Sequence, residues 1–192
     1  MQYVSHVTQA TGTNDKTRKT QAEVDRAQSS PASSEERLFL AHLSSLERYA
    51  KNKDIKLIAH PMRLTQENAD TLIRDYDIVV DGCDNPSTRY LISDVCHRQS
   101  KPYVYAAIGA FQGQVGILCY KQDAPTYRTL FPDEEATCTL KAEKGVIGTT
   151  PAVVGSITAN EVLKLIVGYG EPLIGRLLMI DLLTLNTQLI HL

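Results

Sequence analysis

The stretch that most constrains the fold of this chain lies at residues 76–89, where an apolar run meets an acidic turn. Residues 78–80 are all β-branched and apolar between polar neighbours, which is typical of a strand buried on both faces of a sheet. Residues 82–86 combine glycine, aspartate, asparagine and proline, which indicates a turn. Leu91 and Val95 then share one face of a predicted helix. The stretch therefore predicts a strand, a turn and a helix.

This unit places three polar side chains at the carboxyl end of the predicted strand, namely Asp81, Asp84 and Asn85. Ligands of open α/β sheets bind at that end of the strands, so the turn is a candidate binding site. A structural interpretation is also open, because acids often cap helices and Asp84 could do only that.

The composition indicates a globular chain with a core of its own. Of its 192 residues 43% are hydrophobic, and the net charge of −2 does not call for nucleic acid as a partner. We find no apolar run near the length of a membrane span and no secretory signal, so we expect no membrane partner. The widely spaced Cys83, Cys96, Cys119 and Cys138 contain no C-x-x-C, which favours free thiols, a cytoplasmic location and no structural zinc site.

Residues 1–32 differ in composition from the rest of the chain. They contain no Leu, Ile, Phe or Trp, so they cannot bury enough apolar surface to offset their ordering entropy. We expect an irregular segment, with at most a short strand near residues 3–7, followed by one domain over residues 33–192. Because Gly12 alone of the eleven glycines precedes Gly82, the first third of the chain offers no glycine loop for phosphate.

Predicted helices and strands alternate along the remainder of the chain. Ser33 and Thr65 each begin a helix, the helix after the acidic turn continues to about Arg98, and a further helix covers residues 153–167. We expect strands at residues 55–59, 103–108, 114–119, 177–181 and 187–190.

This alternation predicts an α/β domain with a mixed, mostly parallel sheet centred on residues 78–81 and ending in a hairpin. Residues 121–150 show little periodicity and are expected to form a long loop. The helix over residues 153–167 is apolar on most of its circumference, with a narrow polar strip of Asn160, Glu161 and Lys164. We expect it to be buried in the core or at a subunit contact.

The order of several segments resembles the ThiF/MoeB/HesA family, adenylyltransferases related to ubiquitin-activating enzymes. The resemblance covers roughly residues 55–192 and implies a Rossmann-like three-layer domain. The matching segments are residues 81–89, with the pattern D-x-x-D-N-x-x-x-R; residues 101–105 and 113–114; residues 127–132, close to C-Y-R-C-L-F-P; Cys138 with residues 144–148, Pro151 and Gly155; and residues 168–173 through Asp181.

What the resemblance implies is an ATP-dependent reaction. Family members bind Mg-ATP, and the C-terminal carboxylate of a small ubiquitin-like sulfur carrier attacks the α-phosphate to give an acyl-adenylate for thiamine, molybdopterin or related sulfur transfer. By resemblance Asp84 holds the magnesium, Asn85 and Arg89 contact the nucleotide, and Cys138 joins the activated carrier. A homodimer, or pairing with a complete family member, is also implied.

Other interpretations of these residues are open. Arg89 could pair with Asp94 on its own helix, and Cys138 could be inert. The family's glycine loop and its ribose-holding acid are not found here, and Thr126 and Thr129 stand where the first pair of zinc-binding cysteines would be. We therefore expect weak ATP binding by this chain alone. The alternative function is a non-catalytic module that binds a carrier or dimerises; a nicotinamide-binding oxidoreductase would need the same missing loop.

Overall fold

The computed structural model describes residues 8–9, 56–58, 60, 62–139 and 145–192, and the chain divides into two compact units at Met62. In the smaller unit, β1 (Thr8–Gln9) pairs antiparallel with β2 (Lys56–Leu57), within the strand expected at residues 55–59. The strand expected near residues 3–7 and the helix after Ser33 lie outside the described residues. The irregular segment over residues 1–32 and the domain boundary at residue 33 remain predictions.

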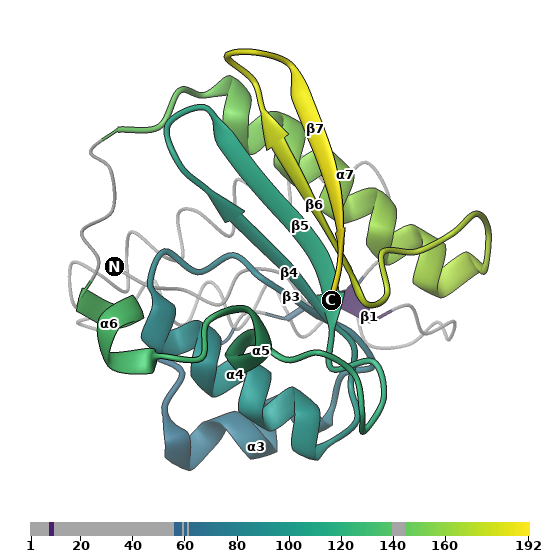
Figure 1. The fold of residues 1–192 in the computed structure, drawn as a ribbon. Helices are drawn as coiled ribbons and strands as arrows, with labels where there is room; N and C mark the ends of the chain where they lie inside the picture. Colours follow the sequence, from purple (N-terminus) through teal and green to yellow (C-terminus); the bar gives the residue numbers. More distant parts are fainter. Residues whose placement is uncertain (1–7, 10–55, 59, 61, 140–144) are drawn as a thin grey trace, which may run out of the picture. The chain divides into compact units, whose positions relative to one another are not determined.

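The larger unit contains a mixed five-stranded sheet (Figure 1). Its order is β3-β4-β5-β6-β7, and the strands are β3 (Val79–Val80), β4 (Tyr103–Ile108), β5 (Gln112–Leu118), β6 (Arg176–Asp181) and β7 (Asn186–His191). β3 and β4 are parallel, whereas the other three pairs are antiparallel. The mixed sheet and the final hairpin are confirmed. For the described strands, the expectation of mostly parallel pairing was wrong, because three of the four pairs are antiparallel, and so was that of a sheet centred on β3, because β3 is an outer strand among them.

Helices cover both faces of the sheet, so the larger unit has three layers. On one face lie α3 (Gln66–Arg74), α4 (Pro86–Arg98) and two short helices, and on the other lies α7 (Thr149–Val167). Because successive side chains of a strand point to opposite faces, Tyr103 and Tyr105 of β4 join the core beside α4, whereas Val104 joins the core beside α7. The α/β class expected from the sequence is confirmed.

The stretch expected to be a long loop contains two short helices, α5 (Tyr127–Leu130) and α6 (Glu134–Thr139). Neither is long enough to show a helical period in the sequence, which is why periodicity missed them. A side-chain hydrogen bond stabilises the start of each helix. In α5, Thr129 Oγ1 accepts a hydrogen bond from Thr126 N at 3.0 Å, and in α6, Asp133 Oδ1 accepts one from Ala136 N at 2.9 Å.

The helix α7 begins four residues before its expected start and ends at Gly168, whose φ of +75° suits glycine. The side chains that it buries are Thr150, Val154, Thr158 and Glu161. On another side Leu163, Ile166 and Val167 are at least half exposed, so the described residues do not bury the helix around most of its circumference as expected.

By length and composition α7 could also cross a membrane, contrary to the expectation that no run is long enough. A helix that covers a sheet meets the same criteria, and α7 packs on β4 and β5.

Glu161 is a buried member of the polar strip on α7 and holds the chain that follows the helix. Its Oε2 accepts a hydrogen bond from Leu173 N at 2.7 Å, and its Oε1 pairs with Lys164 Nζ at 2.6 Å. Asn160, its neighbour in the strip, is exposed. The buried carboxylate is thus neutralised and hydrogen-bonded, as a buried charge must be, and it ties the segment before β6 to α7.

We predict that Gly113→Ala destabilises the protein. A Cβ at Gly113 of β5 would lie 2.2 Å from Cγ2 of Val154 on α7, and the stiff valine cannot rotate away, so we expect a loss of about 1–3 kcal/mol in urea unfolding. Gly155→Ala on α7 is the control, because its Cβ would meet nothing within 4 Å, and it should be neutral or slightly stabilising. Adding Val154→Ala should relieve the clash; equal stability of both glycine variants would contradict this packing.

Candidate functional site

The turn after β3 is held by a buried ion pair between Asp81 and Arg89. Arg89 Nε lies 2.8 Å from Asp81 Oδ2, with side-chain exposures of 13% and 0%. Asp81 Oδ1 accepts a hydrogen bond from Cys83 N at 2.8 Å, and Arg89 Nη2 donates to Cys83 O at 2.6 Å. These contacts close the turn on both sides of Cys83, so strand, turn and helix are fixed to one another.

Arg89 and Asp94, which the sequence left open as an ion pair, have different partners in the structure. Arg89 pairs with Asp81 rather than Asp94, and its guanidinium also lies 5.8 Å from the ring centroid of Tyr105. Burial lowers the pKa of Arg89, but the Asp81 carboxylate, together with Tyr105 and Tyr103, raises it by more, so the net pKa lies above its ordinary value. The resemblance assigned the Arg89 guanidinium to the nucleotide. In this structure the guanidinium is engaged by Asp81 and Cys83 within the turn.

Asn85 is the N-cap of α4, and Asp84 is not. Asn85 Oδ1 accepts hydrogen bonds from Thr88 N at 2.9 Å and Ser87 Oγ at 2.7 Å, and Pro86 follows as the first helical residue. Asp84 is exposed, and its Oδ1 accepts from Asn85 Nδ2 at 3.4 Å. The cap is thus supplied by the neighbour, which leaves the Asp84 carboxylate facing outward at the carboxyl end of β3.

The outward carboxylate of Asp84 fits a magnesium ion in company with a phosphate ligand. Mg²⁺ prefers oxygen ligands and is usually held by one or two carboxylates together with substrate phosphates and water. Among the described residues no three His, Cys, Asp or Glu side chains form a cluster that could hold a metal alone. Asp84 therefore suits a shared metal site rather than a closed protein cage.

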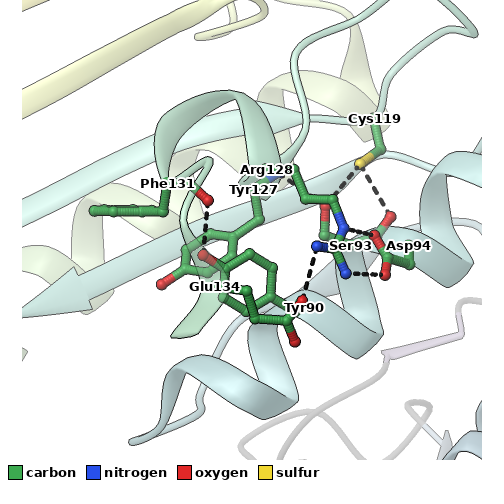
Figure 2. A network of polar contacts seen from close by, with 8 residues as sticks. All are labelled: Tyr90, Ser93, Asp94, Cys119, Tyr127, Arg128, Phe131 and Glu134. Carbon is green, nitrogen blue, oxygen red and sulfur yellow. Dashed lines mark hydrogen bonds and ion pairs between the residues drawn. The ribbon is translucent and has the colours of Figure 1, made fainter. Parts of the chain in front are cut away.

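A second polar network joins α4 to the segment that carries Cys138 (Figure 2). Arg128 of α5 donates through Nε and Nη2 to the two carboxylate oxygens of Asp94, at 2.9 and 2.8 Å, and through Nη1 to Glu134 at 2.8 Å. Its guanidinium lies 4.9 Å from the ring centroid of Tyr90, whose hydroxyl donates to Phe131 O at 2.7 Å.

Sequence reasoning missed the roles of Arg128, Asp94 and Glu134. Arg128 was noticed as part of a family-like segment, but Arg128 and Asp94 are 34 residues apart, and no local spacing relates them. In addition, Ser93 Oγ of α4 accepts a hydrogen bond from Tyr127 N of α5 at 2.9 Å, so a buried contact also joins the two helices.

Thr126 and Thr129 take the places expected for zinc-binding cysteines and form a capping box instead. Their hydroxyl oxygens lie 3.4 Å apart, and Thr129 N donates to Thr126 O at 3.1 Å. Hydroxyls are poor ligands for zinc in proteins, so this pair closes its turn by hydrogen bonds.

The four cysteines differ in burial. Cys138 is exposed on α6, Cys96 and Cys119 are buried, and Cys83 is half-buried in the turn after β3. Burial, together with the charge of Asp81, raises the pKa of the Cys83 thiol to about 12. Cys138 is therefore the most accessible of the four thiols.

The fold and this strand-end turn define a Rossmann-type α/β domain. The profile of the ThiF family matches residues 45–192, and the chain belongs to that family. A crystal structure of E. coli MccB with ATP has a TM-score of 0.64 at 17% identity, covering 79% of this chain and 48% of the other, which supports the same fold.

Curated relatives carry names that describe adenylyltransferases. The chain is 44% identical over 140 residues to a sulfur carrier protein adenylyltransferase of Thermus thermophilus, covering 70% of this chain and 52% of the relative. It is 39% identical over 139 residues to the SAMP-activating enzyme E1 of Haloferax volcanii, covering 71% and 51%. A probable adenylyltransferase/sulfurtransferase, MoeZ, of Mycobacterium tuberculosis is 39% identical over 148 residues, covering 73% and 37%. The chain thus spans about half the length of these relatives or less.

Arg89→Met should destabilise the protein by about 3–5 kcal/mol in chemical unfolding, because it leaves the Asp81 carboxylate buried and unpaired. Arg98→Met, on the same helix, removes an ion pair with Asp70 whose side chains are 55% and 43% exposed, and should cost less than about 1 kcal/mol. A similar cost for the two variants would show that the Asp81–Arg89 pair does not hold the turn.

Native alkylation should modify Cys138 first. At pH 8 a thiol with the pKa of Cys83 is thiolate in about one molecule in ten thousand, whereas Cys96 and Cys119 are shielded by burial. Because the Cys83 pKa lies above the assay range, its labelling should rise about tenfold for each pH unit from 8 to 10. Mass-mapped labelling that finds another cysteine ahead of Cys138 would contradict the placement of α6.

Proposed function

We propose that this protein is an ATP-dependent adenylyltransferase that activates the C-terminal carboxylate of a small ubiquitin-like sulfur-carrier protein. The observation that carries the proposal is the exposed Asp84 carboxylate at the carboxyl end of β3, in a family whose curated relatives are named for this reaction. The buried Asp81–Arg89 pair supports it, because it holds the turn without using Asp84 itself.

The reaction forms one bond and breaks one at the α-phosphorus. A carboxylate oxygen of the carrier attacks the α-phosphorus of ATP, the bond to the β,γ-diphosphate breaks, and acyl-adenylate and pyrophosphate result. A magnesium ion, when bound, neutralises phosphate charge. Asp84 would hold that ion, and Asn85, whose amide already reaches Asp84, would keep the carboxylate oriented at the start of α4.

A second step uses Cys138. Its thiolate sulfur attacks the carbonyl carbon of the acyl-adenylate, the bond from that carbon to the AMP oxygen breaks, and AMP leaves as a thioester forms. Exposure of Cys138 on α6 supports access of a protein-bound acyl group. Thiamine, molybdopterin or related sulfur transfer would use the activated carrier, and we place the protein in the cytoplasm.

The exposed apolar side of α7 supports a proposed homodimer, or pairing with a complete family member. Leu163, Ile166 and Val167 are 50%, 58% and 67% exposed, and such a group on one helix face is what a subunit contact would cover. Ile166→Asp should then yield monomers in light scattering, while Thr71→Asp, at an exposed position of α3 on the other face of the sheet, should not. A wild-type monomer at high concentration would remove the dimer from the proposal.

Pyrophosphate release tests the proposed reaction. With Mg-ATP and a carrier ending in Gly-Gly, Asp84→Asn should lower release on the order of a hundredfold, because the carboxylate that holds the metal becomes a neutral amide. Asp77→Asn is the matched control, since Asp77 is exposed just before β3, at the opposite end of the same strand, and should leave release unchanged.

The same assay decides the alternative. A protein that binds the carrier but releases no pyrophosphate even at high Mg-ATP concentration would be a non-catalytic carrier-binding or dimerisation module. Because we find no glycine loop in the sequence to bind phosphate, we predict that ATP binding by these 192 residues alone is weak.

A further inference from the structure

The helix α4 connects two sites that the proposed reaction uses in succession. Asn85 caps its start beside Asp84, and between one and three turns further on Tyr90, Ser93 and Asp94 hold the returning chain. Segments for carboxylate activation and for transfer to a thiol are therefore attached to the same helix.

One guanidinium links three helices in this region (Figure 2). Arg128 lies on α5, pairs bidentately with Asp94 on α4, and pairs with Glu134 in the first turn of α6. The three side chains are 45%, 33% and 47% exposed, and isolated pairs of this kind stabilise by less than about 1 kcal/mol.

The geometry around Arg128 makes it more than an isolated surface pair. Both oxygens of Asp94 are engaged, which fixes the plane of the guanidinium, and that plane lies against Tyr90. Tyr90 in turn is buried and bonded to Phe131 O, so the arginine rests on a fixed surface. Because the Arg128 guanidinium is held in place, it can in turn fix the position of Glu134 on the short, exposed helix α6.

That partner is α6, a helix of six residues that cannot be stable alone. Glu134 and Cys138 are four residues apart on it, so they lie on the same side, about one turn apart. Holding Glu134 therefore fixes both the position of α6 and the direction in which Cys138 points. Thr137, between them, is buried, and its amide donates to Asp133 O at 3.0 Å.

We propose that Arg128 is a positioning residue for Cys138: by bridging Asp94 and Glu134 it holds α6 against α4 and orients the thiol toward the acyl group activated at the Asp84 turn. The proposal rests on the proposed function for the identity of the reaction, since the thiol step is attack on the acyl-adenylate with departure of AMP. It predicts that loss of Arg128 separates the two steps, leaving activation intact and slowing transfer.

The experiment uses the whole protein with Arg128→Met, Arg128→Lys and Glu134→Gln, and with Arg98→Met as the matched control. Arg98 is also an arginine paired with an aspartate, but at the far end of α4. Three quantities are measured: amide hydrogen exchange at Thr137 and Thr88, pyrophosphate release, and the amount of carrier joined to Cys138 per pyrophosphate released.

In Arg128→Met, Thr137 exchange should become about three- to tenfold faster while Thr88, held by Asn85 at the start of α4, stays unchanged. Pyrophosphate release should remain within about twofold, and the carrier joined to Cys138 per pyrophosphate should fall about tenfold. Arg128→Lys should recover part of the transfer, because it keeps the charge but loses the bidentate bond. Glu134→Gln keeps an oxygen that can accept from Arg128 but loses the charge, so it should shift both readouts in the same direction as Arg128→Met and by less, and Arg98→Met should resemble wild type.

Two results would overturn the proposal. Unchanged Thr137 exchange and an unchanged transfer ratio in Arg128→Met would show that the arginine does not position α6. Equally faster amide exchange at Thr88, with pyrophosphate release and transfer falling in parallel, would show that Arg128 stabilises the whole fold instead. A wild-type protein that releases no pyrophosphate would refute the proposed function, whereas selective acceleration at Thr137 would still support the hold of Arg128 on α6.

Discussion

The ion pair between Asp81 and Arg89 is the interaction on which the strand-end turn depends. A carboxylate with no solvent contact must be matched by a cation and by hydrogen bonds, and Arg89 and the Cys83 amide provide both. The same guanidinium also donates to Ala106 O of β4 at 3.4 Å, so two strands and α4 share one charged contact. Asp81 closes the turn and Asn85 caps the helix, so neither task depends on the exposed Asp84 carboxylate.

The parts of this site that could be predicted from sequence are those set by neighbouring residues. The strand within the apolar run at residues 78–80, the helix after the turn and its end at Arg98 follow from local chemistry, and the structure has all three, although the cap is Asn85 and not Asp84. The C-terminal hairpin followed in the same way from two strands separated by a short turn.

The parts that could not be predicted depend on which segments meet. Strand periodicity is the same for both pairing directions, so nothing local showed that β5 would pair antiparallel with both neighbours. Glu161 was grouped with the exposed Asn160 by its place on a helical wheel, yet it is buried because the chain before β6 brings Leu173 N to it. Arg128 and Asp94 likewise meet only after α4 and α5 have packed.

The pairing of β5 with β6 also bears on the order in which the sheet can assemble. β4 and β5 are joined by a short turn, whereas Gln112 and Asp181, opposite each other in the sheet, are 69 residues apart in sequence. Contacts at such separation form late, because the intervening chain loses entropy before the contact is gained. Until β6 arrives, the outer edge of β5 has backbone groups without their strand partner, and this edge is where a newly made chain is most open to pairing with another copy.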